Sequence, residues 1–180
     1  MSTPDIERRG AVAGVTASGR TLSGYAASYN DPTAIGGFIE RIAPGAFTKS
    51  LASGRDVLAL LDHRADVLLG RTRSGSLKLS EDAKGLRFEL ALPDTAAARD
   101  VIALAERGDL GGMSFGFVAI DEAWDGDTRE LREIQLHEIS VVQSWPAYQS
   151  TSVSLRNRPS VYSTGVGIGH STNHLWMSLL

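Results

Sequence analysis

The β-strand signals of this sequence come in consecutive pairs, and each pair is joined by a short turn. Two β-prone segments in residues 11–29 flank Ser18-Gly19-Arg20, and residues 56–61 and 67–72 flank the polar corner DHRAD. SLKLS and GLRFELAL flank EDAK, and a last pair flanks Asp125-Gly126-Asp127. Strands joined by such short turns run antiparallel. The pattern predicts a mainly β fold with helices (α+β), arranged as a closed or nearly closed antiparallel barrel.

Two segments between the strands predict helices. PGAFTKSLASG predicts a short helix that ends at Gly54, and it follows a short strand in FIERI. DTAAARDVIALAERG predicts a longer helix, with Asp94 as its N-cap and Gly108 as its end. Residues 30–37 are turn formers and predict a loop.

The length of 180 residues and the 42% of hydrophobic residues suit one core and one domain. We place this domain at residues 11–156, between a flexible segment at 1–10 and a flexible tail at 157–180 that is rich in Ser, Gly, Asn and Thr. His170 and His174 in the tail have i, i+4 spacing, but no third ligand lies near them in the sequence. We therefore expect no metal site there.

Composition excludes several function classes. A formal net charge of −3 gives no field that would attract nucleic acid or an anionic membrane, so neither is expected as a partner. The absence of cysteine excludes disulfides, thiolate catalysis and cysteine-ligated zinc. No stretch has the length of a membrane span, and the N-terminus lacks the apolar region of a signal peptide. The sequence predicts a soluble protein that is not secreted and needs no cofactor.

A hydroxyl at the start of the apolar strand GGMSFGF needs an explanation. Ser114 could simply bond a neighbouring carbonyl, as many strand serines do. As a nucleophile it would need a histidine to accept its proton and a third group to orient that histidine. His63 stands at the polar corner between two apolar strands, where it could act as this base or could merely bond Asp62 or Asp66.

His137 and Glu138 in LHEISVV are both candidates for the third group. Adjacent strand residues face opposite sides, so only one of them can join the site. A three-residue loop at 125–127 would place Ser114 opposite Glu138, whereas a two-residue turn at Asp125-Gly126 would place it opposite His137. A bulge could convert one register into the other.

Three further residues could stabilise an oxyanion beside the serine. Gly111 and Gly112 supply backbone that can turn closely, and Arg64 follows the corner histidine.

The motifs GYAASYND, FIERIAPGAF, LLDHRADVLLGRT, GGMSFGF and HEISVVQSWPAY resemble, in order and style, those of the caudovirus prohead serine proteases across residues 21–155. That family resembles the herpesvirus assemblins in fold, which implies a β-barrel with a few surrounding helices. The resemblance implies His63, Ser114 and Glu138 as the catalytic residues, with His137 as the alternative third member that herpesvirus enzymes would favour. It also implies cleavage of the major capsid protein and its scaffold segment inside the assembling procapsid in the host cytoplasm, self-processing of the tail, and a homodimer.

Two alternatives to a protease follow from the same residues. A catalytically silent assembly protein could use the same fold as a scaffold, although an intact serine–histidine pair argues against it. A metal-dependent hydrolase could use His63, His137 and Glu138, but this HE pair lacks the second histidine, four residues on, that a zincin helix needs.

Overall fold

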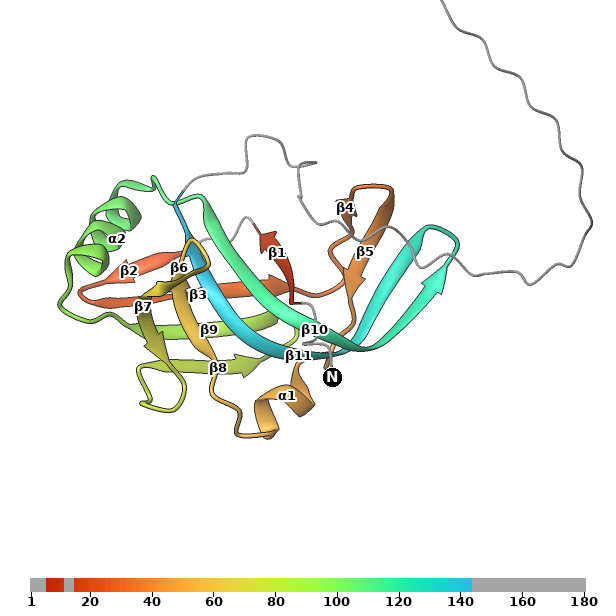
Figure 1. Cartoon of the computed structure of the whole chain (residues 1–180). Helices are drawn as coiled ribbons and strands as arrows, with labels where there is room; N and C mark the ends of the chain where they lie inside the picture. The colour runs from red at the N-terminus through yellow and green to blue at the C-terminus, as the bar shows by residue number, and fades with distance from the viewer. Residues whose placement is uncertain (1–5, 12–14, 144–180) are drawn as a thin grey trace, which may run out of the picture.

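The computed structural model describes residues 6–11 and 15–143, and these form two β-sheets and two helices (Figure 1). The larger sheet contains β1 (Glu7–Ala11), β4 (Thr33–Ile35), β5 (Phe38–Ile42), β6 (Leu58–Leu61), β7 (Arg64–Arg71), β10 (Gly112–Asp125) and β11 (Thr128–Val142). The smaller sheet contains β2 (Thr16–Ser18), β3 (Thr21–Ser28), β8 (Leu77–Glu81) and β9 (Gly85–Ala91). The helices are α1 (Thr48–Ala52) and α2 (Ala96–Arg107). The prediction of a mainly β, α+β fold is confirmed.

The strand pairings of the described residues leave two separate sheets, so the predicted barrel closure is not confirmed. The sequence also predicted only antiparallel pairing, but the larger sheet contains parallel pairs as well. β11 is 15 residues long, and along the edge away from β10 it pairs in parallel with β5 through residues 128–131 and with β6 through residues 138–141. β5 and β6 both run in the direction of β11, and β6 begins further along β11 than β5 ends, so the connection that contains α1 carries the chain forward along the same edge.

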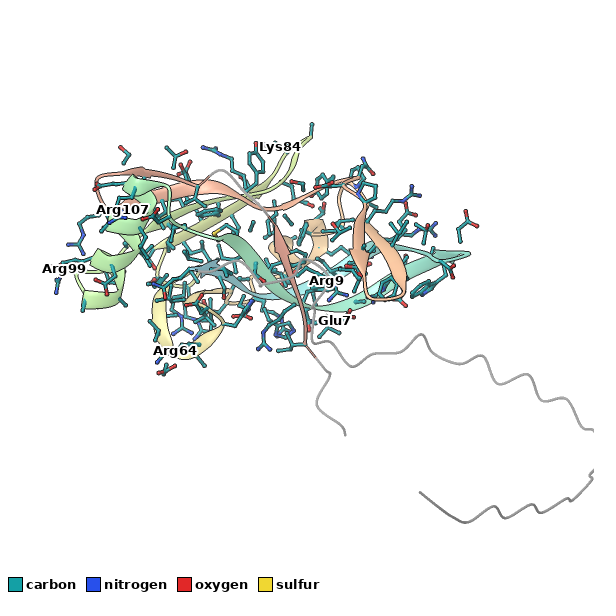
Figure 2. All side chains as sticks on the ribbon, turned by 90° about the horizontal axis from the view of Figure 1, so that it is seen from above. Glu7, Arg9, Arg64, Lys84, Arg99 and Arg107 are labelled. Atoms are coloured by element: carbon teal, nitrogen blue, oxygen red, sulfur yellow. The ribbon has the colours of Figure 1, made fainter. Side chains whose placement is uncertain are left out.

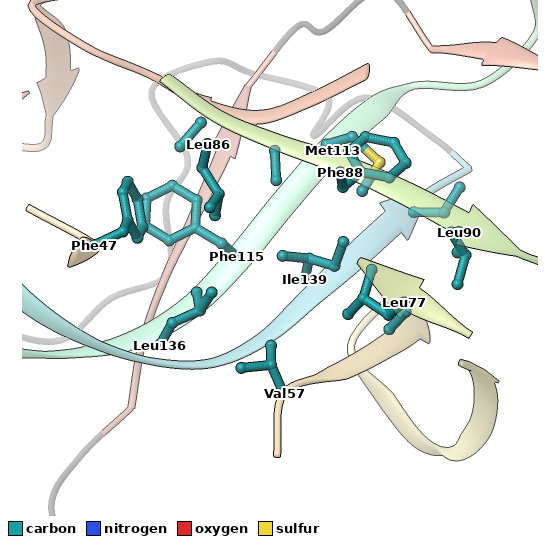
Figure 3. Packing of buried hydrophobic residues seen from close by; sticks show 14 of the residues in the cluster. Phe47, Val57, Leu77, Leu86, Phe88, Leu90, Met113, Phe115, Leu136 and Ile139 are labelled. Carbon is teal, nitrogen blue, oxygen red and sulfur yellow. The ribbon is translucent and has the colours of Figure 1, made fainter. Parts of the chain in front are cut away.

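The core lies between the inner faces of the two sheets. Figure 3 shows Phe115 and Ile139 from β10 and β11 facing Phe88 and Leu90 from β9, and each of these side chains is at most 2% exposed. The ring of Phe115 packs edge-on against Phe47, with the ring centroids 5.8 Å apart. Alternating apolar residues on each strand are what such a two-layer arrangement buries.

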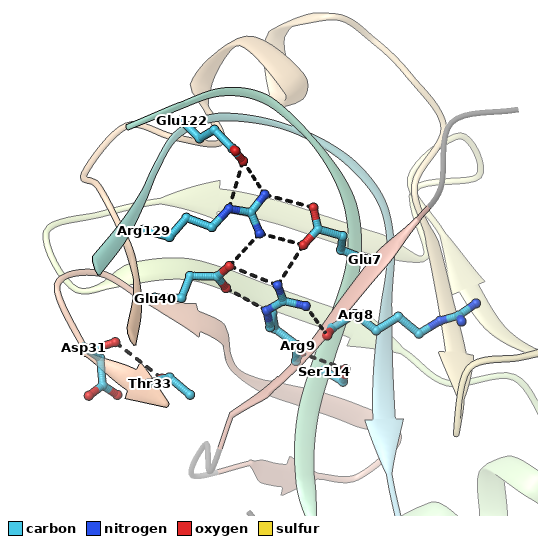
Figure 4. Close-up of polar contacts among 9 residues, drawn as sticks. All are labelled: Glu7, Arg8, Arg9, Asp31, Thr33, Glu40, Ser114, Glu122 and Arg129. Atoms are coloured by element: carbon cyan, nitrogen blue, oxygen red, sulfur yellow. Dashed lines mark hydrogen bonds and ion pairs between the residues drawn. The ribbon is translucent and has the colours of Figure 1, made fainter. Parts of the chain in front are cut away.

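The prediction of a flexible segment at residues 1–10 is wrong for residues 7–10, because these residues belong to β1 on the edge of β10. β1 is held by side-chain ion pairs rather than by an apolar face. The Arg9 guanidinium contacts Glu40 on β5 through both carboxylate oxygens, at 2.6 and 2.9 Å, and Arg129 on β11 bridges Glu40 and Glu7 (Figure 4). Viewed from above, Glu7 and Arg9 lie within the fold, while Arg64, Lys84, Arg99 and Arg107 lie at its periphery (Figure 2).

The predicted turns and caps are mostly confirmed, with local corrections. α2 ends at Gly108 in the left-handed conformation (φ 75°), as predicted, but its N-cap is Thr95, whose hydroxyl accepts from the Ala98 amide. Asp94 instead pairs with arginine side chains. The segment expected to be only a loop, 30–37, contains the three-residue strand β4. Neither helix of the described segments has the length and apolar character of a membrane span.

Candidate active site

The carboxylate of Glu138 on β11 is the centre of a polar cluster on the outer face of the larger sheet. Its Oε1 lies 2.8 Å from Nδ1 of His63 and 3.1 Å from Nε of Arg8, and its Oε2 accepts from the Ser140 hydroxyl at 3.3 Å. Burial by itself raises the pKa of the Glu138 carboxyl, but the hydrogen bond and charge of His63, together with those of Arg8, outweigh it and hold the pKa below 4.5. Glu138 is therefore ionised at neutral pH, although it is only 5% exposed.

His63 reaches this carboxylate because of an unusual turn. Asp62 and His63 are the two residues between Leu61 on β6 and Arg64 on β7, and both have positive φ, 49° and 60°. Two successive left-handed residues are typical of a type I′ turn, in which aspartate and histidine are tolerated better than most side chains. The Asp62 amide donates to the Val141 carbonyl, and its carboxylate accepts from the Gln143 amide, both at 2.9 Å. These bonds fix the turn to the end of β11, beside Glu138.

Gly116 on β10 has no side chain, and this leaves room for the Glu138 carboxylate. The two residues are direct partners in the antiparallel ladder. A Cβ on Gly116 would lie 2.7 Å from both Cγ and Oε1 of Glu138, closer than side chains can pack. Only glycine lets the carboxylate lie against β10 at this point.

Ser114 lies two residues before Gly116 and therefore faces the same side of β10. It is paired with Ser140 on β11, so the polar face carries Ser114, Ser140 and Glu138 together. Ser114 is 3% exposed, and its hydroxyl donates to the Arg9 carbonyl of β1 at 2.8 Å (Figure 4). The sequence allowed Ser114 to bond a neighbouring carbonyl, and the structure shows this bond to Arg9. The same face of the sheet also carries the contact between His63 and Glu138.

Both predicted registers of the β10–β11 hairpin are wrong. Asp125 pairs with Thr128 across a two-residue turn of Gly126 and Asp127, and Ser114 pairs with Ser140 rather than with Glu138 or His137. The ladder also shifts between Gly116, which pairs with Glu138, and Phe117, which pairs with Leu136. His137 is the extra residue of this β-bulge, and bulges of this kind shift the register by one residue.

The structure separates the other candidates from this cluster. His137 contacts Gln135 at 3.2 Å instead of His63, and burial together with the positive charge of Arg55 lowers its pKa below 6.5. The Gly111 amide donates to the Val142 carbonyl at 2.8 Å, and Arg64 is paired with Asp66. Gly112, the other oxyanion candidate, is in the β-ladder opposite Val142. Within the described residues no group of three potential ligands is placed to hold a metal ion.

The sequence of residues 7–162 matches the family model of the caudovirus prohead serine proteases. The chain belongs to this family. The resemblance read from the motifs is confirmed, and the match includes β1, which the motif comparison had left out. No curated protein and no solved structure matches the chain.

Three residues of the cluster escaped the sequence analysis. Gly116 carried a usable signal, because an isolated glycine within an apolar strand indicates a close approach of another group. Ser140 carried a weaker one, two residues after Glu138 and therefore on its face of the strand. Arg8 had none, since only the pairing of β1 with β10 brings it to the site.

Proposed function

We propose that the chain is a serine endopeptidase in which Ser114 is the nucleophile, His63 the general base and Glu138 the group that orients His63. The observation that carries the proposal is the 2.8 Å contact between His63 Nδ1 and Glu138 Oε1, on the same face of the sheet as Ser114. A carboxylate on Nδ1 fixes the tautomer that leaves Nε2 to accept a proton, and it stabilises the imidazolium that then forms.

The reaction begins when the Ser114 hydroxyl leaves the Arg9 carbonyl and turns toward His63, a rotation about a single side-chain torsion. Ser114 Oγ attacks the scissile carbonyl while His63 takes its proton, and His63 then protonates the leaving amine. Water hydrolyses the acyl-enzyme by the same sequence of proton transfers. The sequence suggested Gly111, Gly112 and Arg64 as oxyanion donors. The Gly111 amide donates to the Val142 carbonyl and Arg64 pairs with Asp66, so these two groups would have to move before they could bind the oxyanion, or other donors would have to take their place.

Family membership supports the substrate assignment. The natural substrates are the major capsid protein and its scaffold segment, cleaved inside the procapsid in the host cytoplasm. The tail at 157–180 lies outside the described residues, and we propose that the enzyme removes it by self-cleavage. A homodimer is part of this proposal and rests on the herpesvirus resemblance alone.

Co-expression with the major capsid protein of the same virus tests the proposal. Wild-type protein should shorten the capsid protein and its own tail, and intact-mass spectrometry would give the cleavage sites. The Ser114→Ala variant should leave both at full length, because it removes the hydroxyl that attacks the scissile carbonyl and changes nothing else in the side chain. Shortening at the same rate in both samples would identify a contaminating protease.

A fluorophosphonate probe separates the protease from a silent assembly protein of the same fold. The oxygen of an activated serine displaces fluoride from the phosphorus of the probe and becomes phosphonylated, so the probe should label Ser114 in wild-type protein and lose this label in His63→Ala. A folded wild-type protein that stays unlabelled and leaves the capsid protein whole would favour the scaffolding role.

A further inference from the structure

Arg8 and His63 compete for one oxygen atom. Nε of Arg8 lies 3.1 Å, and Nδ1 of His63 lies 2.8 Å, from the same Oε1 of Glu138. The two cationic groups are therefore within about 6 Å of each other, a range in which a like charge disfavours the protonated form of a neighbour. A serine–histidine–carboxylate site needs only the histidine on that oxygen, so the arginine requires its own explanation.

The position of Arg8 is fixed by the strand that carries it. Arg8 pairs with Gly116 in the β1–β10 ladder, directly beside the place where Glu138 lies against the glycine. Its neighbour Arg9 is buried and bonded to Glu40 through both carboxylate oxygens, so β1 cannot slide without breaking these contacts. The Arg8 side chain itself remains 52% exposed, which makes it replaceable without loss of the fold.

We propose that Arg8 is a positioning residue that limits how strongly Glu138 stabilises protonated His63. The inference rests on the proposed protease function of His63 and Glu138. A buried carboxylate bonded to imidazole alone favours the imidazolium, and an imidazolium cannot accept a proton from Ser114. Arg8 takes up part of the carboxylate's charge and adds its own repulsion, and both effects favour the neutral imidazole, the form that can accept the proton of Ser114.

Other charged groups near the turn do not offset this effect. Asp62 uses its carboxylate on the Gln143 amide, and Arg64 and Asp66 on β7 form a pair with each other. On β11, His137 is bonded to Gln135 rather than to the cluster. None of these contacts involves Arg8, so a change in the protonation of His63 in an Arg8 variant reports on Arg8.

Three variants test the proposal: Arg8→Gln removes the charge, Arg8→Lys keeps it, and Arg87→Gln is the matched control. Arg87, on β9 of the other sheet, is a similarly exposed arginine paired with a carboxylate, that of Glu89. The first readout is the rate of Ser114 labelling by a fluorophosphonate probe between about pH 5 and 9. The acidic limb of the profile should move to higher pH by about half to one unit in Arg8→Gln, and should stay in place in the other two variants.

The second readout does not depend on catalysis. In the Ser114→Ala protein, the ring resonances of His63 can be followed by NMR through the same pH range, with His63→Ala to assign them. Adding Arg8→Gln should raise the midpoint of this titration by the same half to one unit. An unchanged or lowered midpoint in a folded Arg8→Gln protein would overturn the proposal. A wild-type protein that never labels would instead overturn the protease function, while the NMR titration would still decide the role of Arg8.

Discussion

Replacing Gly116 with alanine should damage the site far more than the fold. The new Cβ would stand 2.7 Å from Cγ and Oε1 of Glu138, so the carboxylate has to retreat by roughly 1 Å to reach ordinary contact distance. A retreat of that size breaks the 2.8 Å contact with His63. A misplacement of about 1 Å in a catalytic group costs about a hundredfold in rate, or about 2.7 kcal/mol of transition-state stabilisation.

The stability change of Gly116→Ala is expected to be small. Alanine gains about 0.5–1 kcal/mol over glycine in a strand because it loses less backbone entropy on folding. The lost hydrogen bond to an ionised group costs about 1.5–3 kcal/mol, so the net destabilisation is about 0.5–2.5 kcal/mol. Urea unfolding measures this change in the free energy of unfolding, while fluorophosphonate labelling and capsid-protein cleavage measure the activity.

Gly10→Ala is the matched control for this experiment. Gly10 pairs with Ser114 across β1 and β10, so it is at least as close to the proposed nucleophile as Gly116 is. A Cβ on Gly10, however, would meet nothing nearer than the Met113 carbonyl oxygen at 3.9 Å. Gly10→Ala should therefore keep nearly all activity. If the two variants lost activity equally, or if folded Gly116→Ala kept wild-type rates, Glu138 would not act through the position that this glycine gives it.

Two further expectations concern Glu138 and its neighbours on β11, and a third concerns the ion pairs that hold β1. Glu138→Gln should lower turnover by at least about a hundredfold and His137→Gln far less, and the reverse ranking in folded proteins would give the third catalytic position to His137. Ser140→Ala, which removes the bond to Glu138 Oε2, should lower kcat about tenfold with KM unchanged, whereas a raised KM would indicate substrate contact instead. Burial raises the pKa of Glu7, but its two arginine partners outweigh this and hold the pKa below 4.5. The ion pairs of Glu7 therefore stabilise the fold fully above about pH 4.5, and this stabilisation is lost as the pH falls through the lower pKa that Glu7 has in the folded protein. Urea unfolding at about pH 7 and pH 3 should show a larger fall in the free energy of unfolding for wild type than for Glu7→Gln.

Local signals in the sequence were sufficient to locate the hairpin turns and the helices, but not to set the register of the β10–β11 hairpin. The turns at Gly19 and Gly126 have positive φ, and α2 ends at Gly108, because glycine adopts these conformations without steric cost. The signals were insufficient wherever pairing is long-range. β1 has no apolar alternation in ERRGA, and its place on β10 depends on ion pairs with residues that are distant in the sequence, Glu40 and Arg129.

The candidate site shows the same division. Residue types and family resemblance together indicated His63, Ser114 and Glu138, and the structure brings His63 into contact with Glu138. The geometry that makes this contact was not predictable from residue types. It depends on two left-handed residues at the β6–β7 turn, on a missing side chain at Gly116 and on an arginine from the edge strand.

Ser114 lies opposite Ser140, two residues beyond the predicted partner Glu138. One residue of this difference comes from the turn at Gly126 and Asp127, and the other has a physical cause that the sequence of β11 already contained. In a regular strand Ile134, Leu136 and Glu138 would share one face, and His137, Ile139 and Val141 the other, so no flat strand can bury all four apolar residues together. The structure buries all four in one core. The bulge at His137 is the one-residue insertion that brings both apolar sets to the same side, and it necessarily turns Glu138 and Ser140 to the outer face. A slip in apolar period next to a candidate catalytic residue is therefore evidence for a bulge, and the burial of the apolar residues on both sides decides which face the carboxylate takes.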